Sequence, residues 1–143
     1  MQRRANIEPT RVQKLDCIIL VDDDDVANYV HESLIEDADI ANQVLTAENG
    51  REALALITEQ ASQPDSCPSL IFLDINMPVM NGFGFLEAYR RLEDELPQPV
   101  IIVMLTSSLN PDDLERARRA GASDFLDKPL TSDKLREVVD KHF

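Results

Sequence analysis

Apolar residues gather in short continuous runs along this chain, and each run ends abruptly at polar or turn-forming residues. Three long runs cover residues 17–21, 70–73 and 100–105, and two shorter segments lie at 44–47 and 123–126. Short apolar runs bounded by turn residues are typical of strands that are buried on both faces. The pattern therefore predicts five strands.

A segment with helical character follows each predicted strand. The predicted helices cover residues 26–36, 51–60, 83–92, 111–120 and 132–141. In the first of them, Val26, Val30 and Leu34 recur at helical spacing and form the apolar stripe that supports the prediction. Alternation of strands and helices requires right-handed crossovers. We therefore predict an α/β fold whose parallel sheet is covered by helices on both faces.

Composition is that of one globular domain. The chain has 143 residues, 43% of them hydrophobic and 29% charged, which suits a single folded core. The formal net charge of −13 argues against direct binding of nucleic acid, because phosphate backbones favour basic surfaces. No run approaches the ~18 apolar residues of a membrane span, so we expect no membrane insertion.

The start of the chain differs from the rest. Its sequence, MQRRANIEPTRVQK, is polar and basic and lacks the apolar stretch of a secretory signal. We expect residues 1–14 to be a polar N-terminal extension and residues 15–143 to be the folded domain. The cysteines, Cys17 and Cys67, have no metal-binding or redox spacing. Together these features predict a cytoplasmic protein with reduced thiols.

Three acids, a hydroxyl and an amine stand just after four of the five predicted strands. They are Asp22, Asp23, Asp74, Thr106 and Lys128. The carboxyl ends of parallel strands share one edge of a sheet, so these groups should converge there. Three carboxylates repel one another unless they hold a cation, and their hard oxygens favour Mg²⁺. A carboxylate beside Mg²⁺ and a lysine can attack phosphorus and form an acyl phosphate.

Four motifs carry a resemblance to a known family. The segments ILVDDD, LIFLDINMPVMNG, VIIVMLTSS and DFLDKPL, in this order and at these separations, resemble the receiver domain of response regulators in two-component signalling. The match extends from about Asp16 to the C-terminus. The resemblance implies a doubly wound, flavodoxin-like sheet of five parallel strands in the order 2-1-3-4-5.

The resemblance also implies a role for each residue at the acidic edge. Asp74 is expected to accept the phosphoryl group and to share a Mg²⁺ ion with Asp22 and Asp23, of which Asp23 is the closer ligand. Asn76 is expected to offer its backbone carbonyl to the same metal. These four residues make up the metal site that the resemblance implies.

The remaining implied roles concern the phosphoryl oxygens and the response to them. Thr106 is expected to contact those oxygens and to move with them, and Lys128 to pair with one of them through a loop in which the Lys128–Pro129 bond is cis. Phe125 stands at the aromatic switch position of the family, although a plain core role is an equal reading. His31 lies within a predicted helix and is expected to be structural or exposed.

Other classes of phosphate-handling protein fail on specific residues. A phosphatase of the haloacid dehalogenase type needs Asp-x-Asp, and here the second position is Asn76. A P-loop needs Gly-Lys-Ser/Thr, which the chain lacks, and Asp22 to Asp25 lack the glycine and distal glutamate of an EF-hand. The alternative that Asp22 and Asp23 only cap a helix is weaker, because two caps are redundant.

The predicted function is that of a phosphoacceptor in a two-component phosphorelay. The expected phosphodonor is a sensor histidine kinase or a histidine phosphotransfer protein, and the expected output is a protein-binding surface that phosphorylation changes. Such a chain would catalyse its own phosphorylation and dephosphorylation rather than act as an ordinary turnover enzyme. Two alternatives stay open: a phosphate shuttle or sink, and a receiver cut from a hybrid kinase.

Overall fold

The computed structural model describes residues 14–62, 68–96, 99–107 and 110–143. Residues 1–13 and Cys67 lie outside this part of the chain. The N-terminal extension, the domain boundary at residue 15 and the state of that cysteine therefore stay predictions. Lys14, the first described residue, forms an ion pair with Asp39, with 2.7 Å between Nζ and Oδ1.

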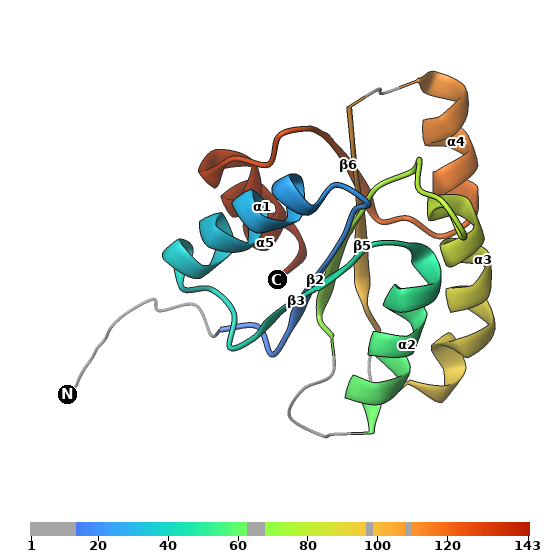
Figure 1. Cartoon of the computed structure of the whole chain (residues 1–143), viewed down its shortest axis with the longest axis horizontal. Coiled ribbons are helices and arrows are strands. Elements are labelled where there is room, and N and C mark those ends of the chain that lie inside the picture. The colour runs from blue at the N-terminus through green and yellow to red at the C-terminus, as the bar shows by residue number, and fades with distance from the viewer. Residues whose placement is uncertain (1–13, 63–67, 97–98, 108–109) are drawn as a thin grey trace.

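Strands and helices alternate along the described chain (Figure 1). The strands are β2 (Ile18–Val21), β3 (Val44–Ala47), β4 (Leu70–Leu73), β5 (Ile101–Thr106) and β6 (Asp124–Asp127). The helices are α1 (Asp25–Ala38), α2 (Gly50–Ala61), α3 (Gly82–Leu92), α4 (Pro111–Arg119) and α5 (Ser132–His142), with a short 3-10 turn, η1 (Glu93–Glu95), after α3. Every predicted strand and helix is present, with ends shifted by one or two residues at most.

The strands form one parallel sheet in the order β3-β2-β4-β5-β6. Counted along the chain this is the order 2-1-3-4-5, so the predicted doubly wound fold is confirmed. Figure 1 shows α1 and α5 on one face of the sheet and α2, α3 and α4 on the other. The order reverses beside β2, and in open sheets of this kind ligands bind where the order reverses, at the carboxyl ends of the strands.

The apolar core has two layers, one on each face of the sheet. Alternate residues of each central strand point to opposite faces, so Ile19 and Val21 pack toward α2 and α3, whereas Ile18 and Leu20 pack toward α1 and α5. All four are at most 2% exposed. This burial on both faces is why the central strands are continuously apolar rather than alternating.

The apolar stripe predicted for α1 does not form its buried face. Val26 and Val30 are 69% and 51% exposed, and the buried residues of the helix are Asn28, His31 and Ile35. The reason is that the first half of α1 lies over the polar ends of the strands, where buried amide and imidazole groups can bond to loop backbone. Spacing therefore assigned the correct helix, but of the three stripe residues only Leu34 packs against the core, whereas Val26 and Val30 face solvent.

Candidate functional site

Strand register places two acids side by side at the carboxyl edge of the sheet. Val21 of β2 pairs with Leu73 of β4, so the residues that follow them, Asp22 and Asp74, leave the sheet together. The backbone continues the ladder there: the Asp74 N–H donates to the Val21 carbonyl at 3.0 Å, and the Asp22 N–H donates to the Ala47 carbonyl at 3.0 Å. The position of both acids is thus fixed by backbone hydrogen bonds.

Asp22, Asp23 and Asp74 form a cluster of carboxylates. Each offers one oxygen, and these oxygens lie within 4.8 Å of one another. Asp22 and Asp74 are 4% and 8% exposed, whereas Asp23 faces solvent. Three hard oxygen donors at this separation, one of them open to water, fit a divalent cation such as Mg²⁺. The acidic site is therefore compatible with metal binding.

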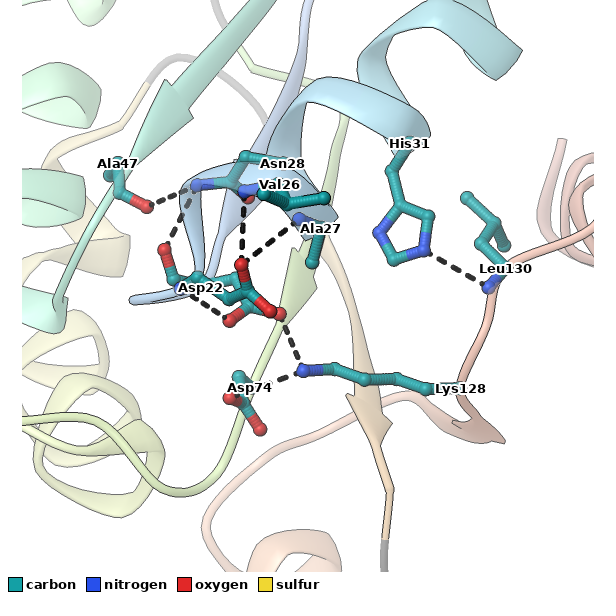
Figure 2. A network of polar contacts seen from close by, with 10 residues as sticks. Asp22, Val26, Ala27, Asn28, His31, Ala47, Asp74, Lys128 and Leu130 are labelled. Carbon is teal, nitrogen blue, oxygen red and sulfur yellow. Dashed lines mark hydrogen bonds and ion pairs between the residues drawn. The ribbon is translucent and has the colours of Figure 1, made fainter.

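Lys128 approaches the cluster from the loop after β6 (Figure 2). Its Nζ lies 2.5 Å from Asp22 Oδ2 and 3.4 Å from Asp74 Oδ2. Burial alone would lower the pKa of Lys128, but the hydrogen bond to Asp22 and the charge of Asp74 outweigh it, and the pKa is raised. The lysine is thus held as a cation between two carboxylates.

The Asp74 carboxyl is destabilised as an anion. Burial raises the pKa of Asp74 above its ordinary value; the charge of Lys128 offsets part of this, and the charge of Asp22 adds to it. An aspartate that loses solvent in this way gains from any additional positive charge placed beside it. A bound divalent cation would supply that charge.

Thr106 and the Lys128 loop meet on the other side of Asp74. Thr106 is the last residue of β5, 1% exposed, and pairs with Asp127 of β6. The Lys128 N–H donates to the Thr106 carbonyl at 2.9 Å, and the Lys128–Pro129 bond is cis as the resemblance implied. The structure therefore brings Asp74, Thr106 and Lys128 to the same edge.

The two other residues with implied roles lie around this centre. Asn76 is exposed and lines an open pocket together with Asp23 and Asn81, on the same side as the exposed acid. Phe125 is half-buried on β6 and packs against the core layer beneath α2 and α3. Its ring is neither a fully solvated side chain nor a fully buried one.

The loop after Asp74 is shaped by a close backbone approach. The Gly82 N–H donates to the Ile75 carbonyl at 2.9 Å, and a Cβ at Gly82 would lie 2.6 Å from the Asp74 carbonyl oxygen. Asn81 caps α3 by accepting a hydrogen bond from the Gly84 N–H at 2.9 Å. The Asn-Gly pair of the motif thus seats α3 directly against the end of β4.

Two buried polar residues on α1 support the site: Asn28, which the sequence analysis did not single out, and His31, which is structural, one of the two alternatives expected for it, rather than exposed. The Asn28 amide donates from Nδ2 to the Asp22 carbonyl at 2.9 Å and to the Ala47 carbonyl at 3.3 Å. His31 accepts a hydrogen bond from the Leu130 N–H at 3.2 Å through Nε2. Both are visible in Figure 2. The available signal was their spacing of three and four residues with Ile35, which marks a helix face that is polar at one end.

Comparison with known proteins assigns the chain to a family. The family model of the response regulator receiver domain matches residues 18–140. The chain belongs to the response regulator receiver domain family. Two-component signalling and the phosphorelay are thus the setting of this receiver domain.

Individual relatives agree with this assignment. Two-component response regulator 24 of Arabidopsis thaliana is 32% identical over 123 residues, which cover 86% of this chain and 81% of that protein. A two-component response regulator of Cytophaga hutchinsonii has a TM-score of 0.81 at 28% identity, covering 90% of this chain and 97% of that one. The receiver domain of the histidine kinase CKI1 from Arabidopsis thaliana, complexed with Mg²⁺, has a TM-score of 0.77 at 25% identity, covering 87% and 89%.

Some curated relatives of this receiver domain are much longer than the chain. The chain spans 34% of a protein-glutamate methylesterase from Halalkalibacterium halodurans and 7% and 8% of two hybrid signal transduction histidine kinases of Dictyostelium discoideum. Receiver domains therefore occur among its relatives both as most of a protein and as a small part of one. Among the helices of the described ranges, none has the length and apolar character to cross a membrane.

Proposed function

We propose that this receiver domain accepts a phosphoryl group on Asp74 in a Mg²⁺-dependent reaction. The observation that carries the proposal is the arrangement of the acidic edge: a buried aspartate at the end of β4, two further carboxylates within 4.8 Å, and a lysine ammonium 3.4 Å from Asp74 Oδ2. A carboxylate so placed has both the nucleophile and the neighbouring positive charge that phosphoryl transfer requires.

The residues that would hold Mg²⁺ are Asp22, Asp23 and Asp74, with the backbone carbonyl of Asn76. When bound, the metal supplies positive charge that stabilises the phosphoryl oxygens and the ionised form of Asp74. The receiver domain of CKI1 was solved with Mg²⁺, which supports the same cation here. Lys128 contacts Asp22 more closely than Asp74, so the lysine and the metal compete for one carboxylate.

In the proposed step Asp74 attacks the phosphorus of a phosphohistidine in line. A bond forms between a carboxylate oxygen of Asp74 and phosphorus, while the bond from phosphorus to the donor nitrogen breaks and its electron pair leaves with that nitrogen. Lys128 offsets negative charge on the phosphoryl oxygens, and Thr106 reaches them with its hydroxyl. Phe125 and the segment after Thr106 respond to the new dianion, which makes α4 the expected site of the output change.

Exposed apolar residues beside the acidic edge support a protein partner as the donor. Val26, Tyr29 and Val30 of α1 are 51% to 70% exposed, and Val79, in the loop after Asp74, is 73% exposed. Apolar groups exposed together often mark an interaction surface. A histidine kinase or phosphotransfer protein that docks there would bring its phosphohistidine to Asp74, in the cytoplasm as the sequence predicts.

A second function stays a candidate because the chain matches both response regulators and hybrid kinases. In the first case, a lasting acyl phosphate switches a protein-binding surface. In the second, the receiver passes phosphate onward or discharges it as a sink. The lifetime of the adduct separates these two functions.

Intact mass after incubation with Mg²⁺ and a small-molecule phosphodonor tests the proposal, with Asp74→Asn as the matched variant. We expect wild type to gain one phosphoryl group and Asp74→Asn to gain none. Uptake should stop when Mg²⁺ is removed by a chelator. Phosphoryl uptake by Asp74→Asn at the wild-type level, or uptake that is unchanged by the chelator, would contradict Mg²⁺-dependent phosphorylation of Asp74. Decay of the adduct then distinguishes switch from sink.

A further inference from the structure

His31 is a buried titratable residue that the proposed mechanism does not use. It lies on α1, 4% exposed, and points from the helix toward the loop that carries Lys128 (Figure 2). Its Nε2 accepts a hydrogen bond from the N–H of Leu130 at 3.2 Å. Leu130 is itself 4% exposed and stands two residues after Lys128. The histidine thus links α1 directly to the lysine loop.

The hydrogen bond defines the state of the imidazole. A ring nitrogen that accepts cannot carry a proton, so His31 is neutral with its proton on Nδ1. Burial lowers the pKa of His31; Asp22 opposes this and Lys128 adds to it. The environment therefore keeps the acceptor in the form that the contact with Leu130 needs.

The other hydrogen bonds to the backbone of this loop come from different directions. The Lys128 N–H donates to the Thr106 carbonyl at 2.9 Å, on the β5 side. Lys134 of α5 donates from Nζ to the carbonyls of Asp127 at 2.8 Å and Pro129 at 3.1 Å, at an exposed position. The hydrogen bond from the Leu130 N–H to His31, in contrast, is buried and connects the loop to α1. The same helix holds the backbone of Asp22 through Asn28.

We propose that His31 is a positioning residue for Lys128: by accepting the Leu130 N–H it holds the loop where the Lys128 ammonium reaches both Asp22 and Asp74. The inference rests on the proposed phosphoacceptor function, which it deepens. Phosphoryl transfer depends on placement of charge more than on new covalent chemistry, and small misplacements of a catalytic group are costly. A loop without this tie lets the ammonium leave the carboxylates.

Two substitutions of His31 distinguish its role as a hydrogen-bond acceptor from its role in packing. In His31→Gln, the amide oxygen is as many bonds from Cα as Nε2 is and can accept the same N–H. In His31→Leu the site stays apolar and filled but has no acceptor. Tyr89→Phe is the matched control, because the Tyr89 hydroxyl accepts a hydrogen bond from the Val100 N–H at 3.2 Å in a similar buried setting on α3, at the amino end of β5.

Three quantities are measured on each purified variant of the 143-residue chain. They are the rate of phosphoryl uptake from the small-molecule donor with saturating Mg²⁺, the dissociation constant of Mg²⁺, and the hydrogen-exchange rate of the Leu130 amide. We expect His31→Leu to take up phosphate at least about tenfold more slowly, to bind Mg²⁺ more tightly because Lys128 no longer competes for Asp22, and to exchange Leu130 faster. His31→Gln and Tyr89→Phe should stay within about twofold of wild type in uptake.

The outcomes distinguish this inference from the proposed function. Wild-type uptake and Mg²⁺ affinity in folded His31→Leu would overturn the positioning role, and so would equally slow uptake in His31→Gln or Tyr89→Phe. If His31→Leu does not fold, His31→Phe supplies the apolar variant. If wild type itself takes up no phosphate, the proposed function fails, whereas Mg²⁺ affinity and Leu130 exchange still report whether His31 holds the lysine loop.

Discussion

Helices α1 and α4 both begin at the acidic edge of the sheet, but they are anchored in different ways. Helix α1 buries Asn28, His31 and Ile35, and the two polar residues bond to strand-end loops. Helix α4, all of whose residues are described, buries Ala117. Its Arg116 forms a cation–π contact with Phe83 of α3, with the guanidinium carbon 4.0 Å from the centre of the ring.

This contrast divides the site into a fixed flank and a loosely held flank. On the fixed flank, α1 holds the backbone of Asp22 and of the Lys128 loop through buried hydrogen bonds, which are costly to break. On the loose flank, α4 rests on one buried alanine and exposed contacts, so little apolar surface opposes its displacement. If Asp74 is phosphorylated as proposed, the groups around it would stay in place on the α1 side, whereas α4, the proposed site of the output change, could be displaced.

The largest effect on phosphoryl uptake is expected from substitution of Lys128, at the centre of the fixed flank. In Lys128→Met the ammonium is gone, and phosphoryl uptake should fall by about a hundredfold or more, the usual loss when one group that stabilises transition-state charge is removed. Mg²⁺ should bind more tightly, by about tenfold or more, because a unit charge a few ångströms from Asp22 no longer opposes the cation. Uptake kinetics and a Mg²⁺ titration measure the two effects.

Opposite movement of the two quantities is the diagnostic result for Lys128. Lys134→Met is a suitable control, because that lysine bonds to the same loop but reaches Asp127, at 3.0 Å from Oδ1, rather than the acid cluster. It should change Mg²⁺ affinity little. Parallel weakening of metal binding and uptake in Lys128→Met would show instead that the lysine mainly maintains the fold.

A smaller effect is expected when Asn28 is changed to Ala. Loss of the two bonds from Nδ2 should lower the free energy of unfolding by about 1–2 kcal/mol, because the Asn28 oxygen, which accepts no hydrogen bond within the described residues, offsets part of the loss. Mg²⁺ affinity should fall as the Asp22 backbone loosens. Urea unfolding and metal titration measure these changes.

Gln60→Ala provides the comparison for Asn28. Gln60 is a buried amide on α2, 8% exposed, far along the helix from the acidic edge, and its oxygen also lacks a hydrogen-bond donor in the described part of the chain. Its removal should leave Mg²⁺ affinity unchanged. Equal metal affinities for Asn28→Ala and wild type would refute the view that α1 holds Asp22 in place.

The contrast between strands and helix faces also explains which features could be predicted from the sequence alone. Strands that are buried on both faces are recognisable in the sequence as continuous apolar runs. Parallel pairing of Val21 with Leu73 then places the residues that follow them side by side at one edge of the sheet. The fold and the convergence of Asp22, Asp74 and Lys128 were therefore predictable. The four motifs that contain these residues, in their order and at their separations, also indicate the family.

Residues that hold the site were not predictable by the same rules. Periodicity assumes that the buried face of a helix is apolar, so it selected Val26 and Val30 and passed over Asn28 and His31. These two side chains are buried because each bonds to backbone that is distant in sequence: Asn28 to the carbonyl of Ala47 at the end of β3, and His31 to the N–H of Leu130 in the loop after β6. Local patterns fail where a functional site imposes its own requirements.

The smallest expected effect lies on the loose flank. Arg116→Ala removes the contact with the Phe83 ring and should lower the free energy of unfolding by about 1 kcal/mol or less, because the guanidinium is exposed to solvent although the ring is buried. Its local effect should be larger than its global one, because α4 has few other anchors. Amide hydrogen exchange across α4 should accelerate in this variant while exchange in α1 stays as in wild type. Glu137→Ala on α5, an exposed position, is the control. If α4 of unphosphorylated wild type already exchanges as slowly as α1, the two flanks are equally stable and the proposed division of the site is wrong.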